Sequence, residues 1–150
     1  MLKLRLKEFD TVQFTKMVRK IKLFANIQMG LLEKILAWVS LYQYKKGEKI
    51  CRQGEPGHSY FIVYEGRVSV GIRKWVFFST RIAELGPGDC FGEMALLRQV
   101  PRNATVTCLE ETKVFMLQAE HFHDAFKGNA AFAQEIEKLA KEREFDYTCR

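Results

Sequence analysis

The sequence predicts an α+β domain in which helices at both ends of the chain flank a β-rich centre. Apolar residues recur at intervals of three and four near both ends, which is typical of amphipathic helices. Between them, seven or eight short β-rich stretches are separated by glycine-containing turns, which predicts a double-sheet jelly roll or a closed barrel. A 150-residue chain with 47% hydrophobic residues suits a single domain. We assign helices to residues 9–40, the β-rich centre to 41–118 and C-terminal helices to 119–145.

Four segments carry the helix predictions. The first is 9–22, with an apolar face made by Phe14, Met17, Val18 and Ile21. The second follows Gly30, and its buried stripe consists of Leu31, Leu32, Ile35, Leu36 and Val39. Residues 119–126 form a third helix that ends at Gly128, and Asn129 begins a final helix that extends to residue 145.

Strands are predicted from β-branched and aromatic content and from alternation of apolar and polar residues. They cover 41–44, 50–51, 60–64, 68–72, 82–85, 103–107 and 112–117, with a further strand end before Gly92. Glu65 and Gly66 give the signal of a tight hairpin between 60–64 and 68–72. A second hairpin is expected within 73–80, although no glycine, proline or asparagine marks its tip.

Residues 91–106, FGEMALLRQVPRNATV, combine a glycine turn, a short helix and an arginine. Gly92 tolerates a strained backbone, the following Met, Ala and Leu residues favour a helix, and Pro101 ends it. Arg102 then lies where a loop enters a strand. Free N–H groups at a helix start, facing an arginine, predict a site for an anion.

Three strings in this part of the chain carry a family resemblance: GEPGHSYFIVYEGRVSV, LGPGDCFGEMALL and PRNATV. They closely resemble the cyclic nucleotide-binding domain of cAMP-dependent protein kinase regulatory subunits, cyclic nucleotide-gated channels and catabolite activator protein. The resemblance covers residues 21–144. It implies an eight-stranded antiparallel β-roll (jelly-roll-like), and it makes residues 91–106 the phosphate-binding cassette with its short helix.

The resemblance also implies roles within the cassette. Arg102 would pair with the cyclic phosphate, and Glu93 would accept a hydrogen bond from the ribose 2′-hydroxyl. Backbone N–H groups of Gly92, Ala95 and Asn103 would complete the phosphate cradle. The implied ligand-binding residues are Phe91, Gly92, Glu93, Met94, Ala95, Leu96, Arg102, Asn103, Ala104 and Val70.

Physical chemistry agrees with these roles and leaves alternatives. A cyclic phosphodiester is a monoanion, and its charge-assisted hydrogen bond to one guanidinium contributes about 1.5–3 kcal/mol. The alternative for Arg102 and Glu93 is that they pair with each other as an ion pair. For Val70, Ile72, Leu96 and Leu97 a place in the core is favoured over a contact with the base, because such apolar residues usually fill interiors.

Two positions depart from the pattern common in the family. His58 stands where many members carry aspartate, which we interpret as a change in a surface turn with little consequence. Asn103 follows the phosphate arginine, where cAMP-selective members often have alanine and cGMP-preferring ones threonine. An amide can bind either purine edge, so the choice of purine stays open, with cAMP placed ahead of cGMP.

The expected function is that of a non-catalytic receptor whose final helix, 129–145, closes over the base as a lid and signals occupancy. The alternatives are a regulatory fragment of a larger channel or kinase, and a scaffold of the same fold that binds no ligand. A protein effector or a neighbouring domain is the expected partner. DNA binding is not expected, since the residues after 145 leave no room for a helix-turn-helix, and no catalytic arrangement is legible.

The remaining features predict a cytoplasmic protein without a metal or cofactor. No apolar stretch reaches the length of a membrane span, and no signal peptide follows Met1. His121 and His123 lie two apart on a predicted helix, so their rings diverge and a metal site is not expected. The cysteines form no CxxC pair and suit reduced thiols: Cys51, Cys90, Cys108 and Cys149.

The net charge is +6, and most of the excess lies near the start of the chain. A basic segment of this kind could contact nucleic acid, an acidic lipid surface or a partner protein. Because basic residues alone carry no specificity, the sequence by itself favours a solvated helix face. The residues are Lys3, Arg5, Lys7, Lys16, Arg19, Lys20 and Lys22.

Overall fold

The structure, a computed structural model, describes residues 1–21, 24–25, 29–75, 78–96 and 101–125, together with scattered residues between 130 and 142. Its elements, in order, are β1 (Leu2–Leu4), α1 (Glu8–Lys20), α2 (Met29–Trp38), β2 (Ser40–Tyr44), β3 (Lys49–Cys51), β4 (Ser59–Glu65), β5 (Val68–Trp75), β6 (Phe78–Leu85), β7 (Cys90–Phe91), the 3₁₀ helix η2 (Glu93–Leu96), β8 (Thr105–Cys108), β9 (Thr112–Gln118) and α3 (Ala119–Ala125).

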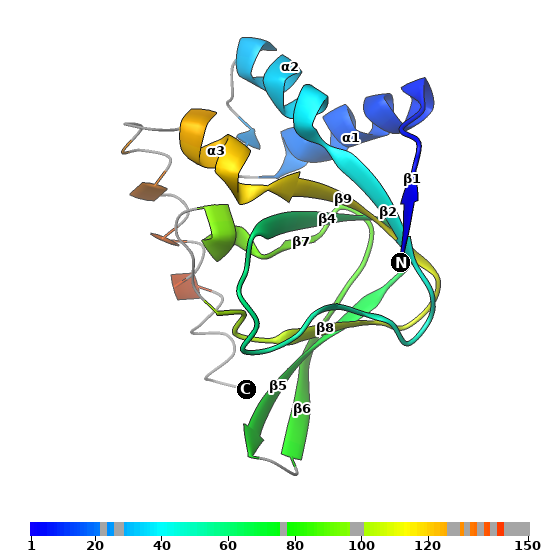
Figure 1. Ribbon diagram of the computed structural model, residues 1–150, viewed down its shortest axis with the longest axis vertical. Coiled ribbons are helices and arrows are strands. Elements are labelled where there is room, and N and C mark those ends of the chain that lie inside the picture. Colours follow the sequence, from blue (N-terminus) through cyan, green and yellow to red (C-terminus); the bar gives the residue numbers. More distant parts are fainter. Residues whose placement is uncertain are drawn as a thin grey trace.

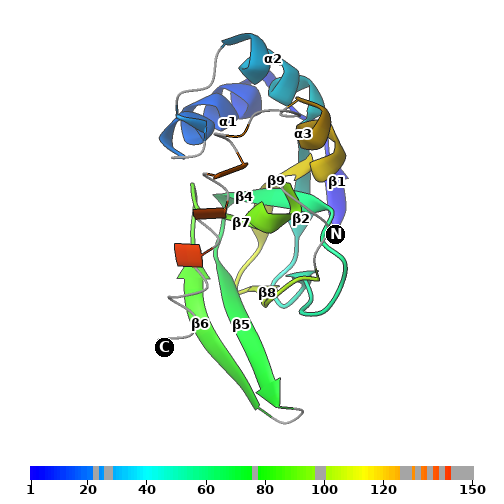
Figure 2. The same ribbon diagram turned by 90° about the vertical axis from the view of Figure 1, so that its left-hand side faces the viewer.

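The strands form two antiparallel sheets, which confirms the predicted β-roll. The five-stranded sheet has the order β1-β2-β9-β4-β7, and the four-stranded sheet has the order β3-β8-β5-β6. Figure 1 shows α1, α2 and α3 gathered at one end of the molecule, while the β5–β6 hairpin extends from the other end. The turned view in Figure 2 shows the same separation.

Strand β4 contributes side chains to two hydrophobic cores, one on each face of the five-stranded sheet. Tyr60, Ile62 and Tyr64 belong to the core that contains the buried residues of α1 and α2, whereas Phe61 and Val63 belong to the core shared with the four-stranded sheet. Alternate side chains of a strand point to opposite faces, so a strand buried on both faces reads as a continuous apolar run. That is why 60–64 is apolar throughout.

The helices cover the outer face of the five-stranded sheet through aromatic contacts. The ring of Phe14 on α1 meets Phe115 on β9 edge-on, with centroids 5.0 Å apart, and Tyr64 stacks on the same Phe115 at 4.6 Å. Phe24 and Phe122 meet at 5.8 Å, which brings the chain after α1 against α3. Aromatic pairs of this kind stabilise a fold by about 0.5–1.5 kcal/mol beyond the area that they bury.

Two turns and the first strand differ in how far their sequence predicts them. The hairpin expected at Glu65 and Gly66 is wrong, because β4 and β5 belong to different sheets and the turn carries the chain between them. The hairpin expected within 73–80 is confirmed by the pairing of Trp75 with Phe78. Strand β1 is absent from the sequence prediction, and it pairs with β2 to form one edge of the five-stranded sheet.

The predicted final helix, 129–145, lies mostly outside the described residues. Its described members are helical, but their contacts with the roll are not described. They are Ala130, Ala133, Gln134, Glu137, Lys138, Lys141 and Glu142.

Candidate functional site

The backbone of Arg102 is held on both sides by the turn that follows β3. Its N–H donates to the carbonyl of Glu55 at 2.7 Å, and its own carbonyl accepts from the N–H of Gly54 at 2.8 Å. Next to it, Pro101 forms an isolated antiparallel bridge with Pro56. These contacts join segments far apart in the sequence and fix where the arginine side chain begins.

The side chain of Arg102 is half-buried and makes one hydrogen bond, from Nη2 to the carbonyl of Ser59 at 2.7 Å. A guanidinium has five N–H donors, so most of them have no acceptor among the described residues. Within that same part of the chain, no carboxylate forms an ion pair with Arg102. The ion pair between Arg102 and Glu93 that the sequence left open is therefore not formed.

Two glycines allow the guanidinium to lie this deep. A Cβ on Gly92 would come within 2.7 Å of Arg102 Nη1 and 2.8 Å of the Ser59 carbonyl, and the φ of Gly92 is +86°. A Cβ on Gly57 would come within 3.0 Å of Arg102 Cζ. Gly92 therefore serves both the turn and the close approach of the arginine.

An aromatic pair supports the arginine from the roll. The ring of Phe61 lies 5.8 Å from Arg102 Cζ, within the range of a cation–π contact. Phe61 in turn stacks on Phe91, with ring centroids 5.0 Å apart and planes 19° apart. Phe91 is the last residue of β7, directly before the glycine of the cassette turn. The same stack thus orders both the cation and the turn.

The charge of this cation acts on a buried thiol. Burial raises the pKa of Cys51 to about 11, against the opposing effect of the charge on Arg102. The thiol therefore stays neutral at neutral pH. It supplies no counter-charge to the guanidinium.

The predicted cassette residues lie together after β7, although several are buried. Glu93 begins η2 and is 9% exposed, the backbone of Met94 lies in the same helix, and the N–H of Ala95 donates to the Gly92 carbonyl at 3.1 Å. Asn103 is exposed. The core holds the remaining predicted residues: Val70, Phe91, Ala95, Leu96 and Ala104. Leu97 lies outside the described residues.

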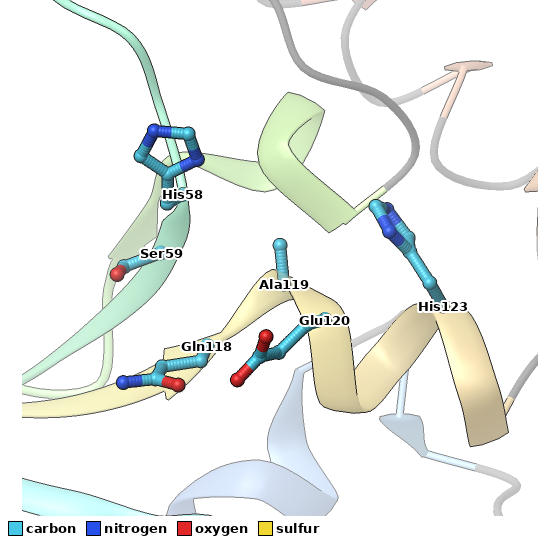
Figure 3. Close-up of a pocket in the computed structure, with 6 residues that line it drawn as sticks. All are labelled: His58, Ser59, Gln118, Ala119, Glu120 and His123. Atoms are coloured by element: carbon cyan, nitrogen blue, oxygen red, sulfur yellow. The ribbon is translucent and has the colours of Figure 1, made fainter.

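Sequence reasoning missed the neighbourhood of His58. This residue and Ser59 line a pocket of about 300 Å³, together with Gln118, Ala119, Glu120 and His123. Figure 3 shows His58 and His123 on opposite sides of this pocket, with the start of α3 between them. The His58 carbonyl also accepts from the N–H of Ala119 at 2.8 Å. His58 is exposed, as expected for a turn, and its backbone carbonyl links this turn to α3.

The peptide at residues 58–59 thus has contacts on both sides. Ser59 accepts from Arg102, and His58 accepts from the first residue of α3. No single local motif reveals this link, because its three segments are far apart in the sequence. The sequence offers one signal for part of this link, namely the aromatic strand that begins at residue 59.

Comparison with known proteins agrees with this geometry. The family model described as Cyclic nucleotide-binding domain matches residues 41–129, more than half of the chain. The chain belongs to the cyclic nucleotide-binding domain family. The match contains both sheets after β1, the cassette and α3, so the Arg102 site lies within the part that defines the family.

Individual relatives extend this comparison. A cyclic nucleotide-gated potassium channel of Mesorhizobium japonicum is 34% identical over 134 residues, which cover 89% of this chain and 36% of the channel. The regulatory domain of protein kinase A from Toxoplasma gondii, solved with cAMP, has a TM-score of 0.74 and 25% identity, covering 80% of this chain and 46% of that one. A cyclic nucleotide-binding domain from Methylobacillus flagellatus has a TM-score of 0.77 and 18% identity, covering 98% and 85%.

The chain spans about a third of the length of the channel relative that it matches. Family members of this kind are regulatory nucleotide-binding domains. Within the described residues, no helix combines the length and apolar character needed to cross a membrane, and no cluster of three metal-ligating side chains occurs.

Proposed function

We propose that this chain is a cytoplasmic regulatory module that binds a cyclic mononucleotide through Arg102 and prefers cAMP to cGMP. The observation that carries the proposal is a half-buried guanidinium that is fixed by the backbone and paired with no carboxylate of the described residues. Such a cation suits a monoanionic cyclic phosphate, which can accept from several N–H donors at once. Glu93 and Asn103 remain the residues proposed for the ribose and the purine.

The rival hypothesis, a scaffold that binds no ligand, leaves the state of Arg102 unexplained. Partial burial of a charge without a counter-ion costs free energy, and the protein holds it there with two glycines and an aromatic stack. A scaffold would gain stability from an apolar residue or an ion pair at this position. A guanidinium that no carboxylate of the described residues pairs with therefore favours an anionic ligand.

Calorimetric titration tests the ligand. We expect cAMP to bind more tightly than cGMP, and adenosine, which lacks the phosphate, to bind at least about tenfold more weakly than cAMP. The Arg102→Gln variant should lose at least about tenfold in cAMP affinity. Arg52→Gln is the matched control, because Arg52 lies in the adjoining turn but forms only an exposed ion pair with Glu55 at 4.0 Å. Equal binding of cAMP and adenosine, or equal loss in both variants, would contradict the proposal.

We also propose that the chain binds the cyclic nucleotide without hydrolysing it. Phosphorus NMR of cAMP incubated with the protein should show an unchanged phosphodiester signal. Appearance of a phosphomonoester signal that depends on the protein would replace the receptor function by an enzymatic one.

We also propose that occupancy is signalled through the C-terminal helices. The support is the backbone link in which Arg102 contacts Ser59 while His58 contacts the start of α3. A phosphate that attracts the Arg102 side chain would change its contact with Ser59. The populations of helix positions shift only if the protein binds the ligand more tightly with the helices in one of these positions. Deletion of residues 130–150 should weaken cAMP binding while the roll stays folded. In a longer channel or kinase, the same helices would reach the effector.

A further inference from the structure

The first twenty residues combine positive charge with exposed apolar side chains, and the proposed function uses neither. Six basic and two acidic side chains give this stretch four of the chain's six net positive charges. The family match begins at residue 41 and does not include it. Of the exposed large apolar residues in the described part of the chain, four of five lie here: Met1, Leu2, Phe9 and Val12, with Met29 on α2 as the fifth.

On α1 the exposed side chains form one stripe. Residues at intervals of three and four lie on the same side of a helix, and the exposed residues at these intervals are Phe9, Val12, Lys16 and Lys20, with the exposed Glu8 one turn before Val12. The opposite side of α1 is buried through Phe14 and Val18. After Glu8, the stripe is apolar in its N-terminal half and basic in its C-terminal half, and α1 presents it away from the core.

The two acidic residues of this stretch are outnumbered by its exposed cations. The carboxylate of Asp10 accepts from the N–H of Lys7 at 3.0 Å and from the hydroxyl of Tyr64 at 2.9 Å, so it is engaged with the helix start and with β4. Glu8 is the other acid. Against it stand five exposed cations, namely Lys3, Arg5, Lys7, Lys16 and Lys20.

We propose that these exposed residues form a basic-apolar face that binds the surface of an anionic phospholipid bilayer. The face consists of the α1 stripe, Phe9, Val12, Lys16 and Lys20, to which the preceding segment adds the exposed cations Lys3 and Arg5. Interfacial helices place aromatic and aliphatic side chains among the headgroups while lysine and arginine contact lipid phosphates and carboxylates. Each basic residue near such a surface strengthens binding about fivefold. A nucleic acid would match the cations but would leave the exposed phenylalanine and valine unused.

The position of the face in the fold suits this role. Figures 1 and 2 place α1 at the end of the molecule remote from the β5–β6 hairpin, and β1 runs from the middle of the molecule toward α1. That hairpin carries two exposed arginines, Arg73 and Arg81, which offer a control of equal charge at a distant site.

Cosedimentation with vesicles tests the proposal. The 150-residue chain should bind vesicles of phosphatidylcholine with phosphatidylserine at least about tenfold more tightly than vesicles of phosphatidylcholine alone, and added salt should weaken binding. The variants K16E/K20E and F9S/V12S should each lose at least about tenfold. R73E/R81E, which changes the net charge by the same amount as K16E/K20E, should bind nearly as the wild type does. Thermal unfolding verifies that each variant is folded.

Two results would overturn the proposal. One is equal loss in K16E/K20E and R73E/R81E, since binding would then follow net charge rather than this face. The other is unchanged vesicle binding by F9S/V12S together with comparable binding of a DNA duplex at the same salt concentration, which indicates a general polyanion surface. A measurement without charge variants gives a second test, because the fluorescence of Phe9→Trp should shift to the blue with phosphatidylserine vesicles, and an unshifted spectrum contradicts insertion.

Discussion

The guanidinium of Arg102 lies against the bare Cα of Gly92, so close that a methyl group there would come within 2.7 Å of Nη1. Gly92→Ala should therefore displace the arginine and weaken cyclic nucleotide binding by at least about tenfold. Gly88→Ala is a matched control, because Gly88 has a similar φ of +89° but open space around its Cα. Both variants should lose about 1–2 kcal/mol of unfolding free energy from backbone strain. Only Gly92→Ala should lose ligand affinity, and equal affinities would separate the glycine from the site.

The buried hydroxyl of Thr112 on β9 contacts backbone carbonyls near the turn that carries the chain from one sheet to the other. It is fully buried and lies 2.9 Å from the carbonyl of Glu110 and 3.3 Å from that of Arg67. Thr112→Val keeps the shape but removes the donor, so chemical denaturation should show a loss of about 1–3 kcal/mol. Thr107→Val on β8 is the control, for which we expect a change within about 0.5 kcal/mol. A stable Thr112→Val protein would mean that the carbonyls find water instead.

A stack between Trp38 and His121 joins α2 to α3, with ring centroids 5.0 Å apart and planes 10° apart. His121→Ala should change the emission of Trp38 and reduce stability by about 0.5–1.5 kcal/mol. His123 lies two residues further along α3, and His123→Ala should leave the emission of Trp38 unchanged. Fluorescence during denaturation measures both quantities, and the same spectrum in both variants would show that the stack does not form in solution.

Alkaline pH should loosen the attachment of α1. Burial, and then the hydrogen bond to Asp10, raise the pKa of Tyr64 to about 12. The neutral phenol is thus favoured in the folded state, and its contribution to stability is complete below about pH 10 and is lost as the pH rises to about 12. Tyr64→Phe should be less stable than the wild type at neutral pH, and its stability should fall less between pH 10 and 12. Denaturation at several pH values measures this, and parallel losses in the two proteins would contradict it.

The cassette could be predicted from the sequence because its signals are local. The glycine turn, the short helix and the arginine follow one another within 91–106, and Gly92 does adopt a positive φ. The periodicity of α1 and the apolar run of β4 are local for the same reason. Such patterns depend on neighbouring residues along the chain.

What failed depends on distant parts of the chain. A glycine turn at Gly66 marks a change of direction but does not say whether the flanking strands share a sheet, and here backbone atoms of Glu111 and Thr112 pack against it from the end of the roll. The support of Arg102 by Ser59 spans 43 residues. Strand β1 pairs with the side of β2 that β9 does not occupy. Nothing in the three residues of β1 predicts this pairing.

The last long strand of the chain, β9, lies in the middle of the five-stranded sheet, between β2 and β4. Translation proceeds from the N-terminus, so β2 and β4 leave the ribosome before the strand that joins them exists. The five-stranded sheet cannot form until residues 112–118 have emerged from the ribosome. Until then, the apolar strand β4 lacks its neighbour β9. Pairing of such distant segments slows folding. Synthesis of this domain therefore has an interval in which the apolar strand β4 is exposed to aggregation.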